Sequence, residues 1–89
     1  MRAIRKFRLE RITNPVILMP RGATILRLTN QTKELVAWAI CRDDVPLVSR
    51  LIRIYASGQE LPDEPGEYLN TVTVLGMEWH CFDGGERTE

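Results

Sequence analysis

Residues 66–82, with the sequence GEYLNTVTVLGMEWHCF, decide the fold that we predict for this chain. Residues 68–75 are rich in β-branched and aromatic side chains, Gly76 offers a turn, and residues 77–82 return with further β-formers. This order predicts a β-hairpin. The same stretch holds His80, which is the only histidine of the chain.

The order Trp79-His80-Cys81 suggests at first a cysteine nucleophile with a histidine base. Such a pair needs its side chains within hydrogen-bond reach, roughly 3 Å. Adjacent residues of a strand point to opposite faces, so the imidazole and the thiol diverge. We therefore predict that Trp79 and Cys81 face inward and that His80 faces outward with Glu78.

Outside this hairpin, the chain alternates short apolar or β-branched runs with Gly, Pro and Asn turns. Residues 35–42 (LVAWAICR) form the most apolar run, which is typical of a strand buried on both faces and predicts a core position for Trp38. Residues 47–56 (LVSRLIRIYA) fit either a strand or a short helix, and their β-branched content favours the strand. Further strands are predicted at residues 2–10, 16–19 and 23–29.

This pattern predicts a single all-β domain of six to seven short strands, folded as an antiparallel sandwich or a small barrel, with one short helix near 47–56 as the alternative. We expect the domain to span residues 1–83. Residues 84–89 (GGERTE) are predicted to form a flexible C-terminal tail.

The formal net charge of zero hides a strong asymmetry. Residues 1–45 carry nine Lys/Arg and four Asp/Glu, whereas residues 46–89 carry three and eight. The two halves can pair within one fold, or a basic edge can meet the acidic edge of a second copy. A chain without net charge also lacks the repulsion that keeps copies apart, so we expect a homo-oligomer.

No apolar run is long enough to span a membrane, and the N-terminus begins with charge, which predicts a protein without a signal peptide in a cytoplasm. Cys41 and Cys81 are then reduced and structural. One histidine and two distant cysteines do not form a metal ligand set. We predict no catalytic residues, no metal and no cofactor, and hence no enzyme.

A basic N-terminal strand carries Arg5, Lys6 and Arg8 around Phe7. Small β-barrels bind single-stranded nucleic acid with basic grooves and stacking aromatic rings, so these residues are candidates for such binding. The zero net charge disfavours this alternative.

The chain resembles a family of small phage and prophage proteins that is described only as a domain of unknown function. The resemblance implies a setting in the cytoplasm of a bacterial host. Cys81 stands where that family usually has an aliphatic residue, which implies packing for this cysteine. The matching positions are Ala3-Ile4, Pro20-x-Gly22-Ala23-x-Ile25-Leu26, Trp38-Ala39, Arg53-Ile54-Tyr55, Gly58, Leu61-Pro62, Gly66-Glu67-Tyr68, Thr71-Val72 and Trp79-His80-x-Phe82.

With this resemblance, we expect a non-enzymatic accessory protein that binds a bacterial host protein, in its most specific form to block a defence system. The alternative is a protein that sequesters a nucleotide signal, with arginines on the phosphate and aromatic rings on the base. The candidate binding residues are Arg5, Lys6, Arg8, Arg50, Arg53, Tyr68, Trp79 and His80.

Overall fold

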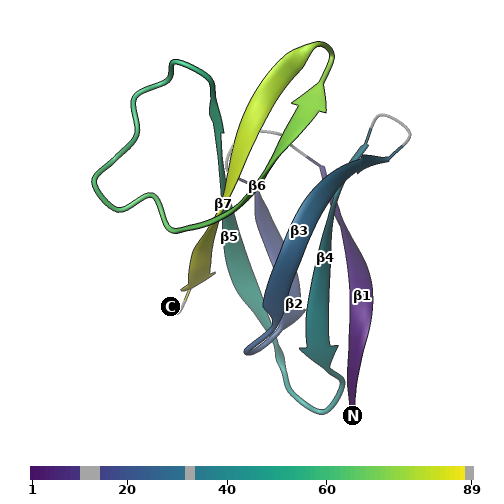
Figure 1. Ribbon diagram of the computed structural model, residues 1–89. Coiled ribbons are helices and arrows are strands. Elements are labelled where there is room, and N and C mark those ends of the chain that lie inside the picture. Colours follow the sequence, from purple (N-terminus) through teal and green to yellow (C-terminus); the bar gives the residue numbers. More distant parts are fainter. Residues whose placement is uncertain (11–14, 32–33, 88–89) are drawn as a thin grey trace.

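Seven antiparallel strands form two sheets that pack as a β-sandwich (Figure 1). The computed structural model describes residues 1–10, 15–31 and 34–87, and within these ranges it contains no helix. The strands are β1 (Arg2–Leu9), β2 (Val16–Pro20), β3 (Thr24–Gln31), β4 (Glu34–Arg42), β5 (Leu47–Ala56), β6 (Glu67–Val74) and β7 (Met77–Arg87). The predicted all-β sandwich is therefore confirmed, and the segment for which a helix was the alternative is strand β5.

One sheet has the strand order β1-β4-β3 and the other has the order β2-β5-β7-β6. Alternate residues of each strand face the space between the sheets, where they form the core. In β4, for example, Leu35, Ala37, Ala39 and Cys41 face inward and are buried. The molecule is thin, with extents of 40 × 31 × 18 Å, as expected for two sheets separated by a single layer of side chains.

The two sheets are tied together where β3 passes β6 (Figure 1). The Asn70 side chain accepts a hydrogen bond from the Leu28 amide (2.9 Å) and donates one to the Leu28 carbonyl (2.8 Å). Asn30 donates a further bond to the Thr73 carbonyl over 3.0 Å. These side chains satisfy backbone groups of two edge strands that would otherwise be unpaired on this side.

Strand β7 continues through Arg87, where the sequence predicts a flexible tail from residue 84. Gly85 opposes Leu51 of β5 and adopts a positive φ of 89°. At Gly84 a Cβ atom would lie 3.0 Å from both the Leu51 side chain and the Leu51 carbonyl oxygen, so glycine favours this close approach. The two glycines thus extend the strand around a bulge instead of ending it, while residues 88–89 lie outside the described residues.

Trp38 does not lie in the core, contrary to the prediction from its apolar run. It is half-buried on the outer face of the β1-β4-β3 sheet, in register with Lys6 on one side and Arg27 on the other. Its indole nitrogen donates to the Thr29 hydroxyl over 3.0 Å. The reason is that this sheet is covered on one face only, so Trp38 and Ile40 on the other face remain partly exposed.

Candidate functional site

The eight candidate binding residues are divided between three places in the structure. One group faces outward from the β2-β5-β7-β6 sheet, a second faces into the sandwich, and a third lies on the basic edge strand. These groups are Arg53, Tyr68 and His80; Arg50 and Trp79; and Arg5, Lys6 and Arg8.

The outward group lies in cross-strand rows on β5, β7 and β6. Arg53 of β5 opposes Phe82 of β7, which in turn opposes Tyr68 of β6. The next row places Tyr55 opposite His80. The Phe82 ring makes edge-to-face contacts with Tyr55 (centroids 5.6 Å apart, 74° between planes) and with Tyr68 (5.4 Å, 66°). The three aromatic rings therefore form one connected surface on the outer face of the sheet.

An open pocket of about 380 Å³ lies over this aromatic surface. Tyr55, Tyr68, Phe82 and His80 form its floor, and the segment after β5, including Ser57 and Leu61, forms its side. We call it the aromatic pocket. Its volume is at the lower end of the range for small-molecule sites, roughly 300–1,000 Å³, and suits one planar ring or one large side chain.

A chain of hydroxyl groups holds the imidazole of His80 in place. His80 Nε2 lies 2.9 Å from the Ser57 hydroxyl, and Nδ1 lies 2.9 Å from the Thr71 hydroxyl. The Thr71 hydroxyl is in turn 2.7 Å from the Tyr68 hydroxyl. In a Ser-His-Asp triad the third member is a carboxylate that stabilises the imidazolium, whereas here both partners of the imidazole are hydroxyls. This arrangement orients polar groups at the rim of the pocket, as a binding site requires.

Sequence reasoning alone identified Tyr68 and His80 but missed the remaining residues of the aromatic pocket. Phe82 is two residues after His80, and this spacing places both side chains on the same face of a strand. That signal was available for Phe82. Ser57 and Leu61 carry no such signal, because they belong to a loop whose path depends on the whole fold.

Arg50 lies inside the sandwich and is not available to a ligand. Its guanidinium forms a bidentate ion pair with Asp83, with Nε donating to Oδ1 over 2.9 Å and Nη2 donating to Oδ2 over 2.6 Å. Nη1 donates to the Ala23 carbonyl over 2.8 Å. Hydrogen bonding to Asp83 raises the pKa of Arg50. Both side chains are only 11% exposed, so this pair is part of the core.

Trp79 and Cys81 face inward, as the alternation of the strand predicts. Trp79 is half-buried and packs against the core, and Cys81 is fully buried. Burial raises the pKa of the Cys81 thiol to about 11. A protonated, inaccessible thiol is not a nucleophile at neutral pH. Among the described residues, no group of three or more His, Cys, Asp or Glu side chains is arranged to hold a metal ion.

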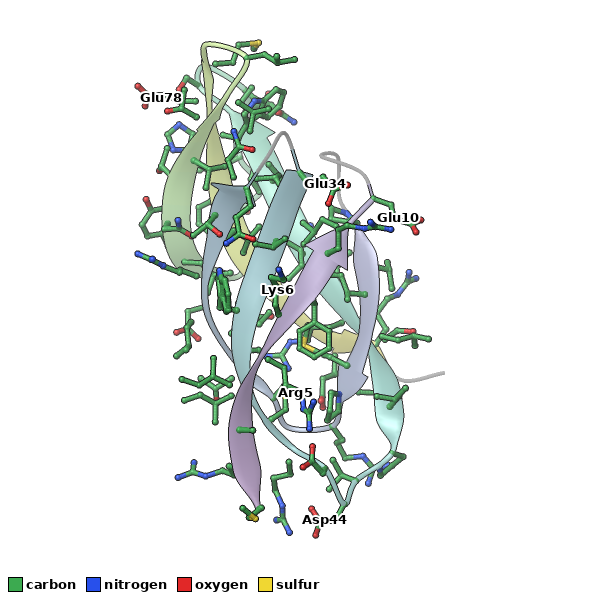
Figure 2. The ribbon with its side chains drawn as sticks, turned by 90° about the vertical axis from the view of Figure 1, so that its right-hand side faces the viewer. Arg5, Lys6, Glu10, Glu34, Asp44 and Glu78 are labelled. Atoms are coloured by element: carbon green, nitrogen blue, oxygen red, sulfur yellow. The ribbon has the colours of Figure 1, made fainter. Side chains whose placement is uncertain are left out.

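The basic edge strand β1 divides its charges between two sides of the sheet. Lys6 and Arg8 lie on the outer face, and Arg5 lies on the opposite side, where it donates to Asp43 over 2.6 Å. Figure 2 shows Arg5 and Lys6 along β1, with Glu34 toward one end of the sheet and Asp44 toward the other. The third group is therefore separate from the aromatic pocket, and the structure does not bring all candidate residues into one site.

The structure defines a small β-sandwich domain with an aromatic pocket on one outer face and basic residues on the other. The described part of the chain holds no helix of the length and apolarity needed to cross a membrane. The chain belongs to the family described as a domain of unknown function, DUF7352, which matches residues 1–89. No curated protein and no solved structure matches the chain.

Proposed function

We propose that this protein is a non-enzymatic accessory protein of the phage or prophage type, which acts in the host cytoplasm by binding a bacterial host protein. The observation that carries the proposal is the aromatic pocket with hydrogen-bonded hydroxyl and imidazole groups at its rim. The phage setting is supported by the sequence resemblance described above. Blocking a host defence protein is the most specific form of this function.

The aromatic pocket suits a protruding apolar or aromatic side chain of the host protein. Tyr68 is 55% exposed, so its ring is free to contact a partner. Exposed tyrosines beside a pocket are typical anchors of protein interfaces, because they supply a large contact area with few rotatable bonds. The Ser57 hydroxyl and the His80 imidazole then provide hydrogen bonds at the edge of the contact.

The test is retention of host proteins from a bacterial lysate on three immobilised proteins: the wild type, Tyr68→Ala and Leu75→Ala. Leu75 is a matched control because it is 94% exposed at the β6–β7 turn and does not line the aromatic pocket. We expect a specific host protein on the wild type and the control, and roughly tenfold weaker binding to Tyr68→Ala. Equal retention by all three proteins would show that the pocket does not bind the partner.

A nucleotide is the second candidate for the bound host component, and the row of Arg53, Phe82 and Tyr68 favours it. A base would stack in the aromatic pocket, and Arg53 would hold the phosphate at its border. A thermal-shift screen with cyclic and ADP-ribose-type nucleotides tests this alternative. We expect stabilisation that is lost in Arg53→Gln, and the absence of a shift with any nucleotide would refute it.

A further inference from the structure

The outer face of the β1-β4-β3 sheet is an uncovered apolar surface. Ile4 is 62% exposed and Leu26 is 42% exposed, and the half-buried Trp38 lies with them. Together with Arg27 these residues line a shallow hollow of about 340 Å³. Large apolar side chains that gather on one face, in contrast to single exposed ones, are typical of an interaction surface.

This surface is surrounded by positive charge. We call it the basic face, and define it by the apolar residues Ile4, Leu26 and Trp38 with the surrounding basic residues. Glu34 pairs with Arg8 over 3.6 Å and Asp44 pairs with Arg42 over 2.8 Å, which leaves Arg2, Lys6 and Arg27 without an ion pair among the described residues. Lys6 lies 5.9 Å from the centre of the Trp38 ring. A partner of this face must therefore present negative charge together with some apolar surface. The basic residues are Arg2, Lys6, Arg8, Arg27 and Arg42.

The chain itself carries a segment with this chemistry, in the loop that joins β5 to β6. We call residues 57–66 the acidic loop. Leu61 within it is 49% exposed. In Figure 1 the loop projects from β5 on the side of the molecule away from β1, so it lies far from its own basic face. The acidic residues of the loop are Glu60, Asp63 and Glu64, followed by Glu67 at the start of β6, and all of them are exposed.

We propose that the basic face binds the acidic loop of a second copy of this chain. The contact places carboxylates of the loop against Lys6 and Arg27, with Leu61 and Pro62 over the apolar centre around Trp38. The two surfaces are different, so the association is head-to-tail and produces a ring or a filament rather than a symmetric dimer. The proposal goes beyond the proposed host interaction, which uses the aromatic pocket.

A symmetric dimer through the free edge of β1 is disfavoured by the same charges. Antiparallel pairing of β1 with its copy would bring Arg2, Arg5, Lys6 and Arg8 close to one another. Like charges directly opposite each other destabilise a pair of strands. The basic edge therefore prevents self-pairing of β1, while the acidic loop provides a complementary surface.

The acidic loop also forms the side of the aromatic pocket, through Ser57 and Leu61. A neighbouring copy that binds the loop consequently fixes this wall of the pocket. Leu61 therefore belongs both to the side of the pocket and to the proposed contact with the neighbouring copy.

The test uses two neutralised variants and their mixture, measured by size-exclusion chromatography with light scattering. The face variant is Lys6→Gln with Arg27→Gln, and the loop variant is Asp63→Asn with Glu64→Gln. We expect the wild type to form species larger than a 10.2 kDa monomer at about 0.05 M salt and to dissociate at about 0.5 M salt. Each variant alone should be monomeric.

The equimolar mixture should form a complex with a mass of about twice 10.2 kDa, because each chain retains one functional surface. Arg21→Gln with Arg87→Gln is the charge-matched control, since both residues are exposed and lie outside the basic face, and it should assemble like the wild type. A monomeric wild type, or a mixture that remains monomeric, would overturn the proposal. The proposal would also be overturned if the monomeric wild type bound a single-stranded oligonucleotide and the face variant did not. Nucleic acid would then be the partner of this face.

Tyr68→Ala separates this proposal from the host interaction. Tyr68 lies in the aromatic pocket and not in the acidic loop, so the variant should assemble like the wild type even where it no longer binds a host protein.

Discussion

The buried ion pair between Arg50 and Asp83 gives the sharpest test of how this sandwich is stabilised. Asp83→Asn should lower the free energy of unfolding by about 3 kcal/mol, the lower end of the range for breaking a buried pair. We expect the lower end of this range because the Arg50 guanidinium keeps two other partners. These are the Ala23 carbonyl at 2.8 Å and the Glu86 carboxylate at 3.8 Å. A domain of this length has a total stability of roughly 4–13 kcal/mol, so the loss is a large share of it.

The measurement is urea unfolding, followed by circular dichroism at neutral pH. The double variant Arg50→Met with Asp83→Leu is the matched control, because it removes both charges and leaves neither one buried alone. It should be more stable than Asp83→Asn, since apolar residues can replace a buried ion pair at little net cost. The reasoning is refuted if Asp83→Asn lies within about 0.5 kcal/mol of the wild type.

The same pair predicts the acid dependence of stability. Burial acts to raise the pKa of Asp83, but hydrogen bonds from Arg50 and from the Gly85 amide outweigh it, so this pKa lies below its ordinary value of 3.8. A carboxyl with a lowered pKa in the folded state contributes stability above its unfolded pKa and loses it as the pH falls through the folded value. The wild type should therefore lose this contribution below about pH 4, and Asp83→Asn should lack that part of the acid transition.

Two further predictions concern the inward residues of the closing hairpin. Because burial raises the pKa of Cys81 to about 11, native protein at pH 8 should react with iodoacetamide far more slowly than protein in urea, and equal rates would contradict the burial. Trp79→Ala should cost about 3 kcal/mol in urea unfolding, whereas Trp79→Phe should cost less than about 1 kcal/mol, because the buried indole nitrogen has no hydrogen-bond partner within the described residues. A large loss in Trp79→Phe would show that this nitrogen is satisfied.

The pattern of residues 66–82 was sufficient to predict the hairpin, and alternation along its second strand predicted the directions of Trp79, His80 and Cys81. It separated His80 from Cys81, and the structure places these residues on opposite faces of β7. The same rule failed for Trp38, because an apolar run does not reveal whether both faces of its sheet are covered. That property depends on the number of layers in the fold, and a strand of nine residues contains no local sign of it.

The role of Arg50 was also beyond local reasoning. An arginine in a strand was assigned to a phosphate, but its partner Asp83 lies 33 residues further along the chain. Asp83 opposes Ile52 in the same register in which Phe82 opposes Arg53, and the bulge that follows between Leu51 and Ile52 places Glu86 opposite Arg50. Alternation from Cys81 therefore predicts the inward direction of Asp83, but it does not predict which residue of β5 pairs with it. Register shifts of this kind are set by tertiary contacts such as the approach of Gly84 to Leu51.

The outward residues of the closing hairpin form a site only because the acidic loop folds beside them. His80 and Tyr68 on a bare sheet would be solvated polar residues, but Leu61 and Ser57 turn the sheet surface into an open pocket. The negative charges of the same loop point to solvent and complement the basic face at the other side of the molecule. If the loop serves both surfaces, Asp63→Asn with Glu64→Gln should abolish assembly, while the monomer still binds the host protein or the nucleotide at the aromatic pocket. Loss of both properties in that variant would instead mean that the pocket is complete only in the assembly.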